Sequence, residues 1–484
     1  MNKKKNHWNI NNSYSKLPKK LYSKQLPEKS INPEKIYFNS NLASELGLNK
    51  FSESEILEYF SGNKIPYGSI PISQAYAGHQ FGRFTMLGDG RAVLIAEHIS
   101  PHNERNDIQL KGSGKTQFSR GGDGKATLSS VLREYIMSEA MHNLGIPTSR
   151  SLAIIKTGEK VFREKEYEGG ILTRVLSSHI RFGTFEYVRN YCSKKELEIF
   201  FNYVLERHYP DLKSAKNQAL NFFDTVMKNH IKLVVDWMRV GFIHGVMNTD
   251  NMSISGETID YGPCAFMDAY DPATVFSSID HLGRYSYANQ PKIAQWNLAR
   301  FAETLLTLID KDLDKAVELA GEIINQFPEI YRGKWLSMMC SKLGLFHVRK
   351  GDEQLVSELL DWMSINKVDY TNTFRALSQL EKPGGEVYQN GQFQTWFSRW
   401  QNRLEDNIKS NESSIELMES LNPAVIPRNH KVEEALESAT AGNLKPFKEL
   451  IGALEDPYTN RASLDPYKNA PKPGGGVYKT FCGT

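Results

Sequence analysis

Between residues 72 and 175, apolar and polar residues alternate in short runs that are separated by glycines. Four of these runs are typical of β-strands, at 84–98, 106–112, 151–164 and 169–176. The stretch 127–145 instead repeats apolar residues every three or four positions. Thr127 or Ser129 can cap its start and Gly145 can end it, so this stretch predicts one helix among the strands.

After residue 190 the spacing of apolar residues becomes helical. The stretch 222–241 places its apolar residues on one face and ends at Gly241, and 293–309 predicts a second helix. Residues before about 70 are rich in Lys, Asn and Pro, which predicts an irregular segment that wraps around a core.

A strand-rich part with one helix, followed by a helical part, is the layout of protein kinases. The expected fold is therefore α+β, a protein-kinase-like (pseudokinase) fold with two lobes. The predicted parts are an N-terminal extension, an N-lobe, a C-lobe and a C-terminal extension, at 1–71, 72–182, 183–410 and 411–484.

Composition narrows the class of protein. The chain of 484 residues is 40% hydrophobic and 24% charged, as in ordinary soluble proteins, and its net charge of +3 does not favour nucleic-acid binding. Its apolar stretches are too short and too charged to span a membrane, and its basic first residues lack the apolar core of a secretory signal. The four cysteines are scattered without a CxxC pair, which favours a reducing cytoplasm.

The stretch "HGVMNTDNMSISGETIDYGP", residues 244–263, resembles the catalytic loop of a protein kinase, H-R-D-x-x-x-x-N, followed by D-F-G. His244 and Asn251 keep the spacing of that loop, and Asp260 begins a D-Y-G. The position of the kinase base, however, holds Val246, which cannot accept a proton. A conventional kinase mechanism is therefore not expected.

Asp250, Asn251 and Asp260 supply the hard oxygen ligands that Mg²⁺ uses when it bridges phosphates. A turn rich in Asp and Asn is the alternative for "TDN", but the joint spacing with His244 favours a metal site. Asp250 is an additional carboxylate beside the metal-binding Asn251, and it could serve as a displaced general base.

Two glycines in "LGDGRAVLI", Gly88 and Gly90, could let backbone N–H groups approach a phosphate, with Arg91 beside them. A plain tight turn is the alternative. "GSGKT" at 112–116 is not a P-loop, because Gln109 stands where that motif needs its first glycine.

Lys111 ends an alternating strand, as the ATP-binding lysine of a kinase does, and Glu134 on the next helix could pair with it. The alternatives are an exposed edge lysine and a solvated glutamate.

Arg174 and Arg181 could hold polyphosphate oxygens with their guanidinium groups, although such a pair is common on surfaces. Asp123 and Gly124 form either a binding loop or an ordinary Asp-Gly turn. The lone His79 is expected to be structural.

Several long stretches together resemble the selenoprotein O family, the YdiU-type protein nucleotidyltransferases. They include "QAYAGHQFGRF", "QLKGSGKTQFSRGGDGKA", "LREYIMSEAMHNLGIPTSRSL", "NPAVIPRNHKVEEAL" and "FCGT", and the resemblance runs from about residue 15 onward. It implies a kinase-like enzyme that binds ATP in a flipped orientation. The implied reaction transfers AMP, or UMP from UTP, to Ser, Thr or Tyr hydroxyls of other proteins and of the enzyme itself, with Mg²⁺ or Mn²⁺.

The resemblance also implies roles for individual residues. Asp250 would accept the proton, Glu134 would position the lysine, and Asn251 and Asp260 would bind metal. The implied ATP contacts are Gly88, Gly90, Arg91, Lys111, Asp123, Gly124, Arg174, Arg181 and Asp260.

Cys482 occupies the place where some family members carry selenocysteine, and Cys264 follows Asp260 by four residues. A reversible disulfide between these two cysteines could control the site, and two unrelated thiols are the alternative. Two other functions also remain open from the sequence: a conventional kinase-like phosphotransferase, and a nucleotide-binding scaffold without catalysis.

Overall fold

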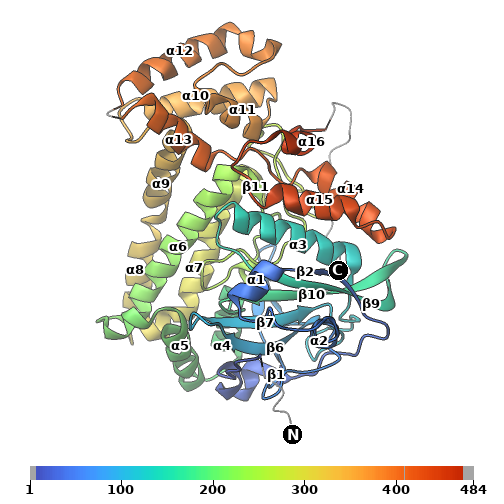
Figure 1. Ribbon diagram of the computed structural model, residues 1–484. Helices are drawn as coiled ribbons and strands as arrows, with labels where there is room; N and C mark the ends of the chain where they lie inside the picture. The colour runs from blue at the N-terminus through green and yellow to red at the C-terminus, as the bar shows by residue number, and fades with distance from the viewer. Residues whose placement is uncertain (1–6, 408, 472–484) are drawn as a thin grey trace.

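The computed structural model describes residues 7–407 and 409–471. The fold combines α-helices and β-strands, and most strands precede most helices in the chain. Figure 1 shows the sheet in the lower half of the molecule, with α3 (Leu128–Asn143) lying across it and long helices beside and above it. The predicted α+β class is confirmed.

One antiparallel sheet of eight strands carries the N-terminal part, in the order β1-β3-β6-β7-β10-β9-β2 with β8 paired to β10. The strands are β1 (Tyr22–Lys24), β2 (Glu34–Phe38), β3 (Ile72–Gln74), β6 (Ala92–Ile99), β7 (Arg105–Lys111), β8 (Ala126–Thr127), β9 (Arg150–Phe162) and β10 (Glu166–Leu176). Two small pairs lie apart from it, β4 (Ala77–Gln80) with β5 (Arg83–Met86), and β11 (Phe242–Ile243) with β12 (Ala265–Phe266). The four predicted strand runs all contain strands.

The N-terminal segment is more regular than its composition predicted. It forms α1 (Ser40–Glu45) and α2 (Glu53–Phe60), and its strands β1 and β2 pair with β3 and β9 at the two ends of the sheet. Short strands within a Lys- and Pro-rich segment give little signal of their own, because the partner strand supplies the hydrogen bonds that make them strands. The expectation of an irregular segment is therefore corrected.

The single helix predicted among the strands is α3, capped by Thr127, whose side chain accepts from the backbone of Ser130. It packs against β9 and β10 on one side and against α14 (Asn429–Thr440) and α15 (Lys445–Leu454) on the other (Figure 1). Arg133 ties these parts together, since it donates to the carbonyl of Cys264 at 3.2 Å and to the side chain of Asn429 at 2.9 Å.

The helical part is built around α6 (Gln218–Val240), which ends at Gly241 in the left-handed conformation, as predicted. The other helices are α4 (Phe182–Tyr191), α5 (Lys194–His208), α7 (Gln290–Ile309), α8 (Leu313–Ile324), α9 (Phe327–Lys342), α10 (Asp352–Asn366), α11 (Tyr370–Leu377), α12 (Gly391–Glu405), α13 (Asn411–Leu421) and α16 (Asp465–Lys468). The helix predicted at 293–309 is α7.

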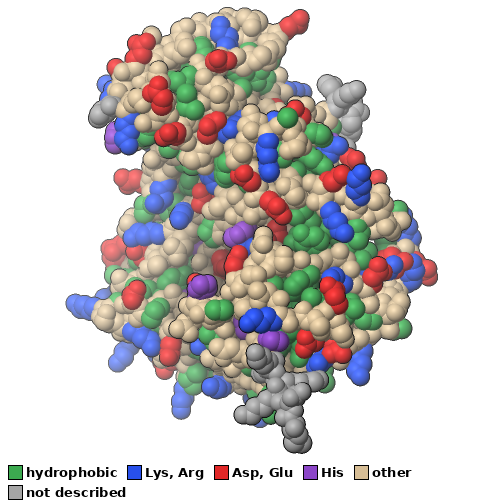
Figure 2. Space-filling view, viewed as in Figure 1, with side chains coloured by type: hydrophobic (Ala, Val, Ile, Leu, Met, Phe, Trp, Pro, Cys, Tyr) green, Lys and Arg blue, Asp and Glu red, His purple; other side chains and the backbone are tan. Residues whose placement is uncertain are grey.

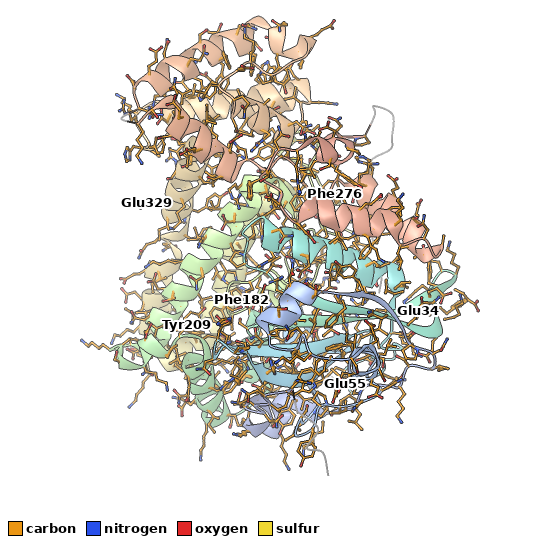
Figure 3. The ribbon with its side chains drawn as sticks, viewed as in Figure 1. Glu34, Glu55, Phe182, Tyr209, Phe276 and Glu329 are labelled. Carbon is orange, nitrogen blue, oxygen red and sulfur yellow. The ribbon has the colours of Figure 1, made fainter. Side chains whose placement is uncertain are left out.

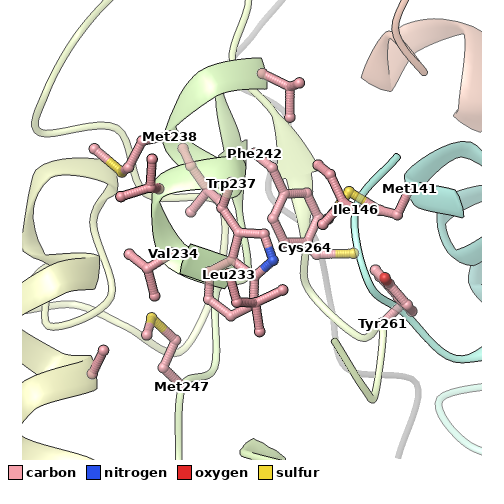
Figure 4. Packing of buried hydrophobic residues seen from close by; sticks show 14 of the residues in the cluster. Met141, Ile146, Leu233, Val234, Trp237, Met238, Phe242, Met247, Tyr261 and Cys264 are labelled. Atoms are coloured by element: carbon pink, nitrogen blue, oxygen red, sulfur yellow. The ribbon is translucent and has the colours of Figure 1, made fainter. Parts of the chain in front are cut away.

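Aromatic and aliphatic side chains join the helical part to the segment that carries the D-Y-G. Trp237 at the end of α6 packs near Phe242, Tyr261 and Cys264 in one buried cluster (Figure 4). Phe182, which is labelled in Figure 3, lies at the start of α4. Its ring stacks on Phe301 of α7 with ring centroids 4.5 Å apart. These contacts hold the loops between the two parts in place.

The surface agrees with the small net charge. On the face that Figure 2 shows, basic and acidic side chains are interspersed. Among the described residues, no helix has the length and apolar character needed to cross a membrane.

Candidate functional site

A cavity of about 330 Å³ lies where the sheet meets the helical part. It is lined by the connection between β3 and β6, the loop 118–125, the end of β10 and the loop that follows β11. All the predicted ATP, metal and base residues line this cavity: Gly88, Gly90, Arg91, Lys111, Asp123, Gly124, Arg174, Arg181, Asp250, Asn251 and Asp260. The fold therefore brings together residues that are up to 172 positions apart (260 − 88).

Lys111 and Glu134 form an ion pair with Nζ and Oε2 2.5 Å apart. Lys111 is only 8% exposed and lies on the inner strand β7, so the alternative of an exposed edge lysine is excluded. Arg174 donates from Nε to the other carboxylate oxygen of Glu134, also at 2.5 Å. Burial alone would raise the pKa of Glu134, but Arg174 and Lys111 hold it below its usual value.

Asp260 joins this cluster from the opposite side of the cavity. Its carboxylate accepts from Arg174, from Arg181 at 2.7 Å and from Lys111 at 3.4 Å. Burial opposes ionisation, but these three cations hold the pKa of Asp260 well below its usual range. Asp260 also has a φ of +65°, an uncommon backbone conformation outside glycine that aims its side chain into the cluster.

The cluster carries an excess of positive charge. Lys111, Arg174 and Arg181 contribute three positive charges against the two negative charges of Glu134 and Asp260. An anion in the cavity would therefore meet a local field that favours it, and the two guanidinium groups match phosphate oxygens in geometry.

The loop with Gly88 and Gly90 packs tightly on the loop 118–125. A Cβ atom at Gly88 would lie 2.4 Å from the ring of Phe118, and one at Gly90 would lie 2.7 Å from the carbonyl of Phe118. Gly88 also has a φ of +121°, which side chains rarely adopt. The chain's own packing therefore requires both glycines, whether or not a phosphate also approaches them.

Asp123 lies at the rim of the cavity and forms a bidentate ion pair with Arg163. The two guanidinium nitrogens lie 2.7 and 3.0 Å from the carboxylate oxygens. The hydrogen bonds from Arg163 lower the pKa of Asp123. Arg163 also lines the cavity, and the sequence analysis did not single it out. Its partner is 40 residues away, so no local spacing points to it.

The loop after β11 is held by its own polar groups. His244 contacts the carbonyl of Ile259 at 3.1 Å, and the amide nitrogen of Asn251 donates to the carbonyl of Val246 at 2.8 Å. The bond from Asn251 uses the nitrogen, so its side-chain oxygen remains an acceptor on the cavity side.

Asp250 is the buried carboxylate of this loop, 7% exposed. Its Oδ1 atom has no hydrogen-bond partner among the described residues, while its backbone carbonyl accepts from Arg181 at 2.8 Å. Burial raises the pKa of Asp250 to about 7, although Arg181 opposes the shift. A carboxylate with this pKa can accept a proton near neutral pH.

Gly78 of β4 packs directly against the side chain of Asp250. A Cβ atom at Gly78 would lie 2.3 Å from Oδ1 of Asp250, so only glycine fits there.

A second network behind Asp250 includes His79, which sequence reasoning treated as structural. The side chain of Glu186 contacts His79 at 2.9 Å and accepts from Thr249 at 2.8 Å, and the backbone N–H of His79 donates to Thr249 at 2.7 Å. Glu186 was not singled out by any spacing. These bonds position the residue immediately before Asp250.

The donor set fits a divalent cation that binds hard oxygen ligands. Asn251 offers an amide oxygen and Asp260 a carboxylate, both on one cavity, and Asp250 lines the same cavity. Among the described residues, no cluster of three His, Cys, Asp or Glu side chains forms a protein-only metal site. A cation here would complete its coordination with phosphate oxygens and water, as Mg²⁺ commonly does.

Cys264 is fully buried beside Trp237 and Tyr261 (Figure 4). Cys482 lies outside the described residues, so the disulfide between the two stays a prediction.

We expect Lys111→Ala to reduce turnover about a hundredfold, because the lysine is placed to contact a phosphate at the cavity wall. The protein should remain folded, since Glu134 keeps its bond to Arg174. Initial rates and the melting temperature measure the two effects. Lys156→Ala, which removes a half-exposed lysine on β9, is the control and should change neither. Normal turnover of folded Lys111→Ala would contradict the predicted role.

The chain is similar to several known proteins along nearly its whole length. A family model described as "Protein adenylyltransferase SelO" matches residues 6–455. The chain is 54% identical over 480 residues to the protein nucleotidyltransferase YdiU of Pelagibacter ubique, with 99% of each chain covered. It is 54% identical over 476 residues to the YdiU protein of Alcanivorax borkumensis, covering 98% of each, and 52% identical over 480 residues to that of Nitrosococcus oceani, covering 99% and 97%.

Proposed function

The chain belongs to the SelO family of protein adenylyltransferases, and on this premise we propose how it works as a protein nucleotidyltransferase. It transfers AMP from ATP, or UMP from UTP, to Ser, Thr or Tyr hydroxyls of other proteins and of itself. The core that does this is a protein-kinase-like fold, in which the sheet and α3 form one lobe and the helices around α6 form the other.

The arginines determine which phosphate reacts. Arg174 and Arg181 lie at the inner wall of the cavity, both buried, and hold Asp260 between them. In the proposed complex they take the β- and γ-phosphates, so that the α-phosphate faces Asp250. The acceptor oxygen then attacks the α-phosphorus, the bond to the bridging oxygen breaks and pyrophosphate leaves.

The proton of the acceptor hydroxyl passes to Asp250. Three properties support this role: the carboxylate is buried, one of its oxygens has no partner, and its pKa is about 7. Asn251 and Asp260 would hold Mg²⁺ or Mn²⁺, and the cation would supply positive charge against the leaving pyrophosphate. This arrangement requires no carboxylate at position 246, because Asp250, four positions later, serves as the base.

The observation that carries the proposal is the buried carboxylate of Asp250, with a pKa of about 7, in the same cavity as Lys111, Arg174 and Arg181. A scaffold without catalysis would have no use for such a carboxylate. A conventional phosphotransferase would instead need the γ-phosphate at Asp250, away from the buried arginines.

Labelled ATP distinguishes these functions. With ATP labelled at the α-phosphorus, label should move to protein, and with γ-labelled ATP none should move. A phosphotransferase gives the reverse result, and a scaffold gives neither. Transfer of the γ-label by the wild-type protein would exclude the proposed reaction.

The pKa of Asp250 predicts how activity depends on pH. Because the base must be ionised, kcat/KM should rise about tenfold per pH unit below 7 and level off above it. Initial rates of α-label transfer between pH 5.5 and 9, at a fixed free metal concentration, measure this profile. A flat profile below pH 7 would argue against Asp250 as the base.

A further inference from the structure

Exposed apolar side chains gather on two short segments beside Asp250. One is the β4–β5 hairpin, and the other is the loop 276–285 that precedes α7. Of the sixteen large hydrophobic side chains that are exposed among the described residues, five lie on these segments: Phe81, Phe84, Met86, Ile279 and Leu282. Leu282 is 97% exposed. Such a concentration of apolar surface next to a site marks a place where another molecule binds.

The two segments form one surface, called here the hairpin surface. The rings of Phe81 and Tyr285 are in contact, with centroids 5.2 Å apart. The backbone N–H of Phe81 and the hydroxyl of Tyr285 both donate to the side-chain oxygen of Asn248, at 3.0 and 2.6 Å. The surface is thereby fixed to the residue two positions before Asp250.

The hairpin surface is continuous with the cavity. Tyr76 and Gln80, at either end of β4, line the cavity, and Gly78 between them packs against Asp250. Phe81 follows Gln80 directly and begins the exposed part. A polypeptide that brings a hydroxyl to Asp250 from solvent would therefore have its neighbouring residues next to the hairpin.

The backbone at the hairpin tip holds an aromatic residue where glycine would be easier. Phe81 has a φ of +49°, which is unfavourable for a bulky side chain. A glycine at this turn would remove the strain. The side chain of Phe81 is 37% exposed to solvent. The strained Phe81 therefore favours a binding role at the tip over a purely structural one.

The hairpin surface also carries positive charge. Arg83 is exposed at the hairpin turn, and Arg284 stacks over Trp296 with 4.8 Å between the guanidinium carbon and the ring centroid. Neither arginine forms an ion pair with any acidic side chain in the described part of the chain. A carboxylate on a bound partner would meet two uncompensated cations.

We propose that the hairpin surface docks the acceptor segment of the substrate protein, and this rests on the proposed function. The segment is extended, carries an apolar side chain close to its acceptor hydroxyl and has an acidic residue beside that side chain. The apolar side chain covers Phe81 and Leu282, and the carboxylate faces Arg83 and Arg284.

The test uses peptides with a central Ser, Thr or Tyr, in which each flanking position is set in turn to Leu, Asp or Ser. Labelling from α-labelled ATP is measured with the full chain. Leu at one or two flanking positions should raise kcat/KM about tenfold over Ser, since burying a leucine side chain is worth that much or more. In Leu282→Ser and Phe81→Ser this ratio should fall to near one, with ATP affinity unchanged. Asp beside that Leu should also raise kcat/KM over Ser in the wild type, and in Arg83→Ser only this preference for Asp should disappear.

Ile365→Ser is the matched control, because it removes a similarly exposed apolar side chain, 76% exposed, on α10. It should keep both preferences. A wild-type enzyme without a Leu preference, or a Leu282→Ser variant that keeps it, would overturn the proposal.

Two other occupants of the hairpin surface give different results. If it joins two copies of this chain, sedimentation would show a wild-type dimer that Leu282→Ser dissociates. If it binds lipid, wild type would float with vesicles of phosphatidylcholine and phosphatidylglycerol and Leu282→Ser would not. Either result overturns the docking proposal.

The peptide assay also separates failure of the docking proposal from failure of the proposed function. If wild type labels neither itself nor any peptide from α-labelled ATP, the proposed function fails and the docking proposal fails with it. If wild type labels itself but shows no flanking preference, only the docking proposal fails.

Discussion

Asp250→Asn should bind ATP nearly as tightly as the wild-type protein and transfer α-label about a hundredfold to ten-thousandfold more slowly. The substitution removes the proposed proton acceptor and keeps the shape of the side chain, and loss of a general base typically costs this much. No phosphate contact is removed, since the carbonyl of residue 250 still accepts from Arg181. Initial rates and calorimetric titration with ATP measure the two quantities.

Thermal unfolding separates this catalytic loss from misfolding. An Asp in an unfolded chain has a pKa of about 4, whereas burial raises the pKa of Asp250 to about 7 in the folded protein. Between these values the folded state binds more protons than the unfolded state, so stability falls as pH rises and the cost is complete above pH 7. Asn carries no charge and avoids this cost. At pH 8 the variant should therefore melt at or above the wild-type temperature; an inactive variant that melts well below it would point to misfolding.

Asp260→Asn should abolish the dependence of nucleotide binding on Mg²⁺ or Mn²⁺ and lower turnover at least a hundredfold. The variant loses the proposed metal ligand and the carboxylate that Arg174, Arg181 and Lys111 share. Titration with ATP, with and without metal, should give equal affinities for the variant and different ones for wild type. Stability should also fall by about 3 kcal/mol, because Arg181 is left buried without a carboxylate partner.

Asp268→Asn is the matched control for this loss of stability. Asp268 also pairs with a buried arginine, Arg428, at 2.6 Å, and its side chain is exposed to a similar extent, 25% against 23% for Asp260. Arg428 keeps a second carboxylate partner, Asp369 at 2.7 Å, so the control should be destabilised by less than Asp260→Asn. It should keep the effect of metal on ATP binding. If both variants lost that effect, general destabilisation rather than metal ligation would explain the result for Asp260.

Local patterns of the sequence predicted the elements that depend on neighbouring residues. Helix α3 begins at its Thr127 cap and α6 ends at Gly241, because a cap or a left-handed glycine acts on the adjacent turn. Lys111 at the end of a strand and Glu134 on the next helix could be proposed as a pair, because strand and helix follow directly in the chain. The spacing of His244 and Asn251 likewise lies within a single loop.

Other features had no local signal. The edge strands β1 and β2 come from a segment whose composition predicted no strand, and they became strands because the sheet offered free hydrogen-bonding edges. The contact of Glu186 with His79, and that of Asp123 with Arg163, join residues 107 and 40 positions apart. No periodicity or motif reports such pairs.

The sequence by itself determined the four strand runs between residues 84 and 176, the helices α3, α6 and α7, their caps, the kinase-like spacing and the missing carboxylate at Val246, since each of these depends on residue types a few positions apart. The tertiary structure alone decided that Asp250 is buried against Gly78 with a raised pKa, that Asp260 is shared by three cations, and that the β4–β5 hairpin lies beside the base. A pKa depends on burial and on charges within a few ångströms, and those are set by packing between segments that are distant in the chain.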